Sequence, residues 1–226
     1  MAEAVAQWDL VHPPGLLGAP RSALGEVKPG DLALCGYFCD NLDGGPPGAR
    51  FLARQIRYFS QPASAHEGVH DLDDFNVFPL EPEKHKAAIF RQLDKIAAAG
   101  GVPILVGGDR SGLSILEQHV AARLGCRPVV CRTGMQHLHP LQWAPWILAL
   151  DLSDWPFPGM ATIGASYDRS RLLDHLDARP GPAVGAAIFG LAPALDWSGA
   201  AETRLARDLL ASVVAILAKG PADAAP

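Results

Sequence analysis

The chain lacks several features that would assign it to a common functional class. None of its apolar runs approaches the ~18 residues that span a bilayer. Residues 1–15 have neither the basic segment nor the apolar core of a secretory signal. The 19 basic residues form no cluster and are outnumbered by 24 acidic ones. We therefore expect a cytoplasmic protein that binds neither membranes nor nucleic acid.

Cysteine is also scarce, and four cysteines are compatible with reduced thiols in the cytoplasm. Cys35 and Cys39 lie near the ends of an expected strand, whose four residues separate them by roughly 13 Å. One zinc ion cannot be reached by both unless the chain bends sharply between them. We interpret Cys35, Cys39, Cys126 and Cys131 as buried structural thiols.

What is present is enough apolar material for one domain over residues 1–226, with 49% hydrophobic residues. Residues 1–30 carry several prolines and glycines and read as an irregular, packed N-terminal arm. Residues 220–226 are expected to form a disordered tail.

Apolar runs of strand length alternate with amphipathic segments of helical length, which is typical of an α/β domain. The expected strands are Leu32–Phe38, Val102–Val106, Val129–Arg132, Ile147–Leu152 and Val184–Phe189. The expected helices include Glu81–Ala99, Ser111–Leu124 and Ala200–Leu217.

The central stretch, residues 102–116, reads VPILVGGDRSGLSIL. A buried-type strand is broken by two glycines and followed by Asp109, Arg110 and Ser111. The carboxyl end of a strand, just before a helix, is where ligands bind in α/β sheets. The alternative is a plain strand–turn–helix in which Asp109 or Ser111 caps the helix.

This GGDRS motif (residues 107–111) resembles the Gly-Gly-Asp-His-Ser signature of the ureohydrolases, the arginase and agmatinase superfamily. Residues 47–57 resemble the block that follows the first strand in that family, and residues 71–77 resemble its Asp-x-Gly-Asp-x-Asn strand. Residues 183–199 resemble its C-terminal block. The resemblance covers about residues 30–217. It implies an arginase-like fold, three-layer α/β/α with a mainly parallel sheet, and in active members a centre of two metals, usually manganese.

The same resemblance implies that this metal centre has been lost. Arg110 stands where the family has a metal-binding His, and an arginine has no lone pair to offer a metal. The strand ending at Arg132 lacks the family's Asp-Ala-His-x-Asp ligands. Ser153 replaces the second Asp of a metal-binding pair that begins with Asp151, and Gly190 replaces an active-site Glu.

Two histidine-containing segments could nevertheless hold a metal. His137 and His139 form an H-x-H pair that could bind one divalent ion with Asp109 or Asp151, or could simply be loop histidines that hydrogen-bond the surface. Residues 66–74, HEGVHDLDD, mix possible ligands at irregular spacing. A strand sends alternate side chains to opposite faces, so we do not expect a metal in that segment.

Two functions remain open. The first is a metal-free pseudoenzyme without arginase or agmatinase activity, which acts as a binding or structural subunit in a homo-oligomer, or in a hetero-oligomer with an active relative. Its candidate ligand-binding residues are Asp109, Arg110, Ser111 and Asp151, and no cofactor is expected. The alternative is a rebuilt enzyme, with or without a single divalent metal, for C–N hydrolysis or a related reaction on a guanidino or amine-containing small molecule. Its candidate catalytic residues are Asp109, Asp151, Asp154, His137 and His139.

Energetics favour the first function. Metal coordination lowers the pKa of water from ~15.7 to ~7, which is worth roughly 12 kcal/mol. A single general base contributes only ~3–5 kcal/mol.

Three further expectations concern charged and aromatic side chains. Arg110 is expected to pair with Asp151 or Asp154 in place of the metals. Arg50 and Arg57 either bind an anion or belong to a solvated helix face or an internal ion pair. The segment LQWAPW, residues 141–146, is either an interface anchor or packs over its own subunit.

Overall fold

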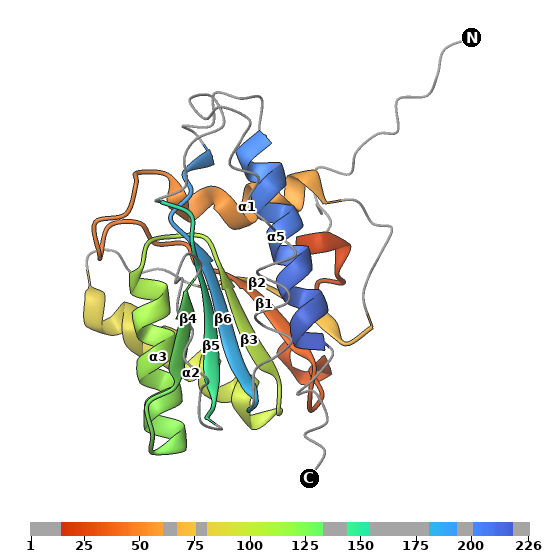
Figure 1. The fold of residues 1–226 in the computed structure, drawn as a ribbon, viewed down its shortest axis with the longest axis vertical. Helices are drawn as coiled ribbons and strands as arrows, with labels where there is room; N and C mark the ends of the chain where they lie inside the picture. Colours follow the sequence, from red (N-terminus) through yellow and green to blue (C-terminus); the bar gives the residue numbers. More distant parts are fainter. Residues whose placement is uncertain are drawn as a thin grey trace.

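The structure is a computed structural model that describes residues 15–60, 67–75, 81–132, 144–153, 181–193 and 201–218. Within these residues, six strands form one sheet in the order β2-β1-β3-β6-β5-β4, and every neighbouring pair is parallel (Figure 1). The strands are β1 Leu32–Gly36, β2 Val69–Asp74, β3 Val102–Val106, β4 Val129–Arg132, β5 Trp146–Asp151 and β6 Ala183–Phe189. The expectation of a mainly parallel sheet is confirmed.

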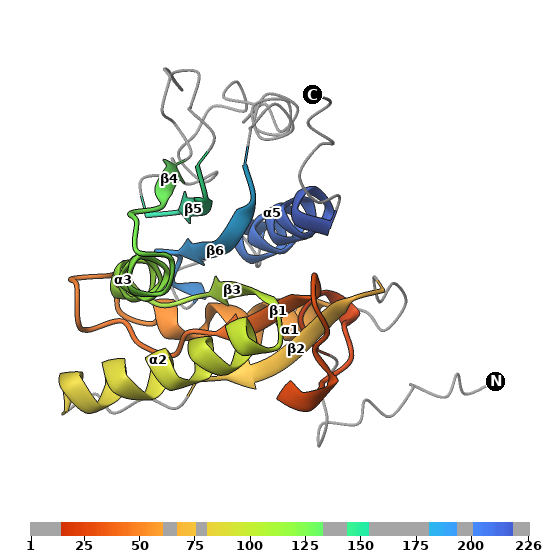
Figure 2. The same cartoon turned by 90° about the horizontal axis from the view of Figure 1, so that it is seen from below.

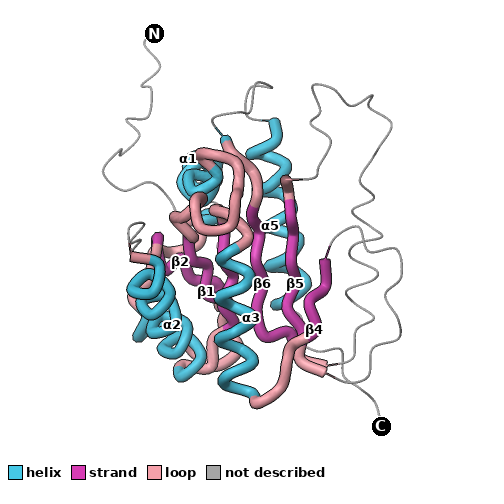
Figure 3. Tube along the Cα trace, turned by 90° about the vertical axis from the view of Figure 1, so that its left-hand side faces the viewer, coloured by secondary structure: helices cyan, strands magenta, loops and turns pink. Residues whose placement is uncertain are grey.

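Helices cover both faces of this sheet, which makes three layers (Figures 2 and 3). Helices α2 and α3 lie together on one face, whereas α1 and α5 lie together on the other. The helices are α1 Leu52–Phe59, α2 Pro82–Ala98, α3 Ser111–Leu124 and α5 Ala201–Ala218, and short 3₁₀ turns occur at Leu16–Gly18, Leu24–Glu26 and Ala49–Phe51. None of the described helices is long and apolar enough to cross a membrane.

The central strands are buried on both faces, as strands of a parallel sheet between two helical layers are. Leu32 and Leu34 belong to the core shared with α1 and α5. Ala33 and Cys35, the residues between and after them, belong to the core shared with α2 and α3. The continuous apolar run of β1 therefore contributes side chains to both cores.

Strand β1 ends at Gly36, two residues before the expected end at Phe38. The Phe38 ring instead packs edge-on against Phe51, with 5.3 Å between ring centroids. The guanidinium of Arg54 lies over the same ring at 4.1 Å from its centroid. These contacts take the chain out of the sheet and toward α1.

Strand β2 contains an extra residue relative to β1. Leu34 lies opposite Asp71 and Gly36 lies opposite Asp74, so two steps along β1 match three steps along β2. Asp73 has a positive φ of 67°, which absorbs the additional residue in a bulge. As a result Asp71 and Asp74, which a regular strand would send to opposite faces, reach the same partner.

That partner is Arg57 on α1, whose side chain is only 2% exposed. Its Nε and Nη2 donate to the two carboxylate oxygens of Asp71 at 2.8 and 2.9 Å, and its Nη1 donates to Asp74 at 2.5 Å. Asp71 also accepts a hydrogen bond of 2.7 Å from the backbone N–H of Leu16 in the N-terminal segment. The internal ion pair is thus confirmed for Arg57, whereas the side chain of Arg50 is 44% exposed and lies 3.8 Å from Asp40.

The segment at residues 141–146 is described only from Ala144 onward. Trp146 is buried in the subunit, and its indole N–H donates to the carbonyl of Gly181 at 2.9 Å. Trp146 therefore packs within its own subunit, while Trp143 lies outside the described residues.

The bulge predicts an unusual ranking of substitutions at Asp73. Both Asp73→Gly and Asp73→Ala remove the carboxylate, but only glycine adopts a positive φ without steric cost. We expect Asp73→Gly to be more stable than Asp73→Ala by about 1 kcal/mol in urea unfolding. Equal stabilities would show that the positive φ of Asp73 carries no strain.

Arg57→Met should lower the free energy of unfolding by about 3–5 kcal/mol, because it leaves a buried carboxylate uncompensated. The control Arg54→Met removes an arginine that is 55% exposed and also bonded to Asp74, and should cost less than about 1 kcal/mol. Urea unfolding at pH 7 measures both. Equal costs for the two variants would mean that burial of the Arg57 pair does not matter.

The Arg57 effect should depend on pH. Burial by itself raises the pKa of the Asp74 carboxyl, but the charge and hydrogen bonds of Arg57, helped by Arg54, outweigh it and lower the pKa. The stability gained from this depressed pKa is present above about pH 4 and is lost as the pH falls through the folded-state value. The difference between wild type and Arg57→Met should therefore shrink on acidification below pH 4.

Candidate functional site

The GGDRS motif lies at the carboxyl end of β3, where the chain turns into α3. Asp109 is fully buried there. Its Oδ2 accepts backbone N–H bonds from Leu42 at 2.8 Å and Asp43 at 2.9 Å. Its Oδ1 accepts the N–H of Ser111 at 3.0 Å and also the Ser111 hydroxyl. Four donors thus fill the roughly four acceptor positions of the carboxylate.

These bonds connect the beginning of α3 to the loop that follows β1 through the Asp109 side chain. The bond from the Ser111 N–H satisfies a free donor at the beginning of α3, although the N-cap position is Arg110 and not Asp109 or Ser111 as expected. The bonds from residues 42 and 43 tie down the loop that follows β1. Gly45 in this loop lies so close that a side chain there would collide with Asp109.

A chain of hydrogen bonds leads from Asp109 into the core between α2 and the sheet. The Ser111 hydroxyl lies 2.6 Å from the Tyr37 hydroxyl, which lies 3.2 Å from Nε2 of His85. Because a carboxylate only accepts, Ser111 donates to Asp109 and must accept from Tyr37. Tyr37 therefore accepts from His85, whose Nε2 carries a proton. The Asp109 carboxylate, which only accepts, thus determines which group donates in each hydrogen bond of the series.

Gly108 of the motif and Gly112, which follows the motif, make room for the Tyr37 ring. A Cβ on Gly108, which has a φ of 74°, would collide with the ring and with nearby backbone. A Cβ on Gly112 would lie 3.0 Å from the same ring. Burial is the main cause that raises the pKa of the Tyr37 phenol, so this hydroxyl stays protonated as a donor.

Asp151 ends β5, two strands away from Asp109, or roughly 10 Å across the sheet. It is half-buried, and it accepts the N–H of Ser153 at 3.1 Å and the Ser153 hydroxyl at 2.5 Å. Gly190 lies between the two strand ends, and a Cβ there would come within 2.8 Å of the Asp151 carboxylate. The residue at the family's Glu position is therefore a close packing contact of Asp151.

The expectation that Arg110 pairs with Asp151 is wrong. Arg110 is exposed and forms no ion pair with any described residue. The expectation assumed that carboxylates without metals would need a cation. Neutral N–H and O–H donors satisfy Asp109 and Asp151 instead. Asp154, the other expected partner, lies outside the described residues.

The other candidate metal ligands include histidines of two segments. His137, His139 and His66 lie outside the described residues. In the part of the chain that the structure describes, no three His, Cys, Asp or Glu side chains gather as a metal site would require. In residues 67–74, His70 instead bonds Ser22 and Asp31, each at 2.9 Å.

The cysteines follow the expectation with one exception. Cys35, Cys39 and Cys131 are buried, and burial is the main cause that raises the pKa of the Cys35 thiol. Cys126 is exposed, so its interpretation as a buried thiol is wrong. It follows the C-terminus of α3, where the chain turns at the surface.

Sequence reasoning missed His85 and Tyr37. A signal for His85 was available, because it shares the buried face of α2 with Ile89, Leu93 and Ile96. A polar side chain on an otherwise apolar helical face needs a buried partner. Nothing in the sequence pattern shows which side chain that partner is.

No family model and no curated protein matches the sequence. Solved structures do match. The structure is similar to proclavaminate amidino hydrolase from Streptomyces clavuligerus, with a TM-score of 0.72 and 16% identity over 92% of this chain and 98% of that one. It is also similar to agmatine ureohydrolase of Thermoplasma volcanium, with a TM-score of 0.63 and 16% identity over 92% and 95% of the two chains.

The fold is that of the ureohydrolases. A third neighbour with this fold, formimidoylglutamase from Bacillus subtilis, gives a TM-score of 0.59 and 16% identity over 95% of both chains. These matches confirm the arginase-like architecture that the GGDRS motif and its flanking blocks imply. The ureohydrolase fold thus remains in a chain whose GGDRS carboxylate is bonded to a loop and a hydroxyl.

The hydrogen-bond chain can be tested with tyrosine variants. Tyr37→Phe leaves the Ser111 hydroxyl without its donor and His85 without its acceptor, and should cost about 1–3 kcal/mol. Tyr58→Phe removes a hydroxyl from a side chain that is 64% exposed and should be neutral. Thermal unfolding compares the two. A Tyr37→Phe variant as stable as the wild type would refute the chain of hydrogen bonds.

Proposed function

We propose that this protein is a degenerate ureohydrolase whose metal centre has been replaced by hydrogen bonds, and that it acts as a binding or structural subunit in the cytoplasm. It has neither arginase nor agmatinase activity. The observation that carries the proposal is the saturation of Asp109 by two loop N–H groups, the Ser111 N–H and the Ser111 hydroxyl.

A metal at this edge would have to displace those donors. Each displaced donor in this partly buried site would lose a hydrogen bond, which typically contributes about 0.5–1.5 kcal/mol. The adjacent Arg110 would add a positive charge beside the ion and no lone pair for it. The Asp109 carboxylate is therefore better suited to accepting hydrogen bonds from the loop after β1 than to binding a cation.

The same edge retains features suited to binding. Arg110 is exposed next to the buried Asp109, pairs with no acidic side chain of the described residues, and has a planar guanidinium that bonds carboxylates or phosphates in a fork. Ser111 and Asp151 are partly accessible at the carboxyl ends of β3 and β5, where α/β proteins bind ligands. Asp109 holds the loop that borders this edge. We assign ligand contact to Arg110, Ser111 and Asp151, and loop positioning to Asp109.

The similar structures point to related chemistry for the ligand. Their names describe enzymes for amidino, agmatine and formimidoyl compounds, and a small guanidino or amine-containing molecule would fit a derivative of that fold. In an oligomer, alone or with an active relative, such a site would bind without hydrolysis. The rebuilt-enzyme alternative depends chiefly on His137, His139 and Asp154.

Metal content and hydrolysis decide between the two. Purified protein dialysed against manganese, nickel or zinc should hold far less than one ion per chain by elemental analysis. It should release neither urea nor ammonia from arginine, agmatine or formiminoglutamate. An agmatinase treated in parallel provides the positive control for loading and for the assay. Stoichiometric metal or turnover would overturn the proposal in favour of a rebuilt enzyme.

The variant Arg110→His sharpens this test, because it restores the motif Gly-Gly-Asp-His-Ser without supplying the other missing ligands. It should fold like the wild type, since Arg110 is exposed and makes no ion pair with described residues. It should still bind no stoichiometric metal. If this one change restores a loaded centre, the carboxylates at this edge are available to metals and the closure described above is incorrect.

A further inference from the structure

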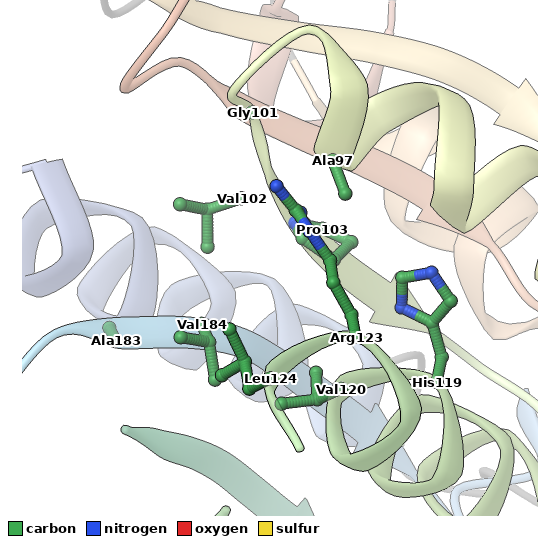
Figure 4. Close-up of a pocket in the computed structure, with 10 residues that line it drawn as sticks. All are labelled: Ala97, Gly101, Val102, Pro103, His119, Val120, Arg123, Leu124, Ala183 and Val184. Carbon is green, nitrogen blue, oxygen red and sulfur yellow. The ribbon is translucent and has the colours of Figure 1, made fainter. Parts of the chain in front are cut away.

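A cavity of about 120 Å³ lies at the other end of the sheet, at the amino ends of β3 and β6 (Figure 4). The C-terminal turns of α2 and α3 form its other walls. Most of the lining is apolar, including Val102, Pro103, Val120, Leu124 and Val184. Among the described residues, two polar side chains line the cavity, and both come from α3: His119 and Arg123.

His119 brings an unsatisfied nitrogen to this cavity. The residue is 4% exposed, and its Nε2 lies 2.9 Å from a carboxylate oxygen of Asp94. Because a carboxylate accepts, Nε2 carries a proton, and Nδ1 is the ring atom left for a further hydrogen bond. Nδ1 is buried and has no hydrogen-bond partner among the described residues. The Phe90 ring packs edge-on against the imidazole, with 5.6 Å between centroids, and fixes its orientation.

Arg123 brings a positive charge to the same place. Figure 4 shows its side chain running from α3 past the cavity toward Val102 and Pro103, with the Nδ1 edge of His119 turned to the same side. Arg123 is exposed and forms no ion pair with any residue in the described ranges. The N–H groups of the Arg123 guanidinium therefore lie beside the buried Nδ1 of His119 and the apolar walls of the cavity.

We propose that this cavity binds a short aliphatic carboxylate that carries a hydroxyl or amino group next to the acid. The carboxylate bonds the guanidinium of Arg123 in a fork. The adjacent hydroxyl or amino group donates to Nδ1 of His119. The aliphatic tail fills the recess between β3, β6 and α3. The site is separate from the GGDRS edge and does not depend on the function proposed for that edge.

The size and polarity of the cavity select this class of ligand. A cavity of about 150 Å³ lined by apolar side chains holds benzene, so a recess of 120 Å³ suits a branched tail of about three or four carbons. A water molecule could bond Nδ1, but it needs two to four polar partners and the walls here are mostly apolar. A ligand that donates to Nδ1 and covers these walls satisfies both requirements.

Binding can be measured by calorimetry and ligand-observed NMR on the full chain. The probes are 2-hydroxy-3-methylbutanoate and valine, which separate a hydroxy acid from an amino acid. The controls are 3-methylbutanoate, which lacks the donor, and 3-methylbutan-2-ol, which lacks the carboxylate. At least one probe should bind with a Kd of about 1 mM or tighter, and each control about tenfold more weakly. Absence of binding by both probes, or equal binding of probe and controls, overturns the proposal.

Three variants locate the bound probe. Arg123→Gln removes the charge, and His119→Gln keeps a group near the Nε2 position while removing Nδ1. Each should weaken binding about tenfold or more. Ala97→Leu fills the cavity and should abolish binding.

The matched control Arg91→Gln removes an exposed arginine of α2 that does not line the cavity, and should leave the Kd unchanged. Because Arg123 is exposed, its variant should fold even if the cavity-filling one does not. Binding that survives Arg123→Gln, or falls equally with Arg91→Gln, places the probe elsewhere and refutes the site.

Discussion

The buried ion pair between Arg57 and Asp71 is the constraint on which one side of the molecule depends. A guanidinium that is 2% exposed survives in a core only if its charge and its N–H groups are matched. Asp71 matches it in a fork, and the bulge at Asp73 brings Asp74 to the third donor position. Through Leu16, the same carboxylate also holds the N-terminal segment. Helix α1, strand β2 and the N-terminal segment are therefore joined by the carboxylate of Asp71.

The carboxyl edge of the sheet is organised by a different principle. In a metal enzyme, carboxylates at such an edge are neutralised by cations. Here Asp109 is surrounded by four neutral donors, and Asp151 accepts from the N–H and hydroxyl of Ser153. Hydrogen bonds distribute the stabilisation of each charge over several weak donors, so no single cation is needed. The edge is thereby closed with its carboxylates still present, and Arg110 is left exposed.

The sequence predicts the parts of this structure that depend on local pattern. Strands β3 and β4 and helix α3 have the expected bounds, because apolar periodicity and glycine punctuation define them. The bulge was harder to foresee, although Asp73 occupies the glycine position of the Asp-x-Gly-Asp-x-Asn pattern and has the positive φ that glycine favours.

What could not be predicted depends on contacts between distant segments. The chain from His85 through Tyr37 to Ser111 joins three elements whose meeting is decided by helix packing. The donors to Asp109 include backbone N–H groups of residues 42 and 43, which no side-chain pattern reveals. Counting only side-chain charges led to the incorrect pairing of Arg110 with Asp151.

The strand order has a consequence for synthesis of the protein on the ribosome. Strands β1, β2 and β3 can pair as soon as residue 106 has emerged, and β4 and β5 can pair after residue 151. The two part-sheets have no shared edge until β6, residues 183–189, enters between β3 and β5. During that interval the nascent chain presents two open, apolar strand edges, which are the surfaces that chaperones protect from aggregation. Because the strand that joins the two part-sheets is the last of the described strands to be made, the growing chain is most vulnerable before β6 is in place.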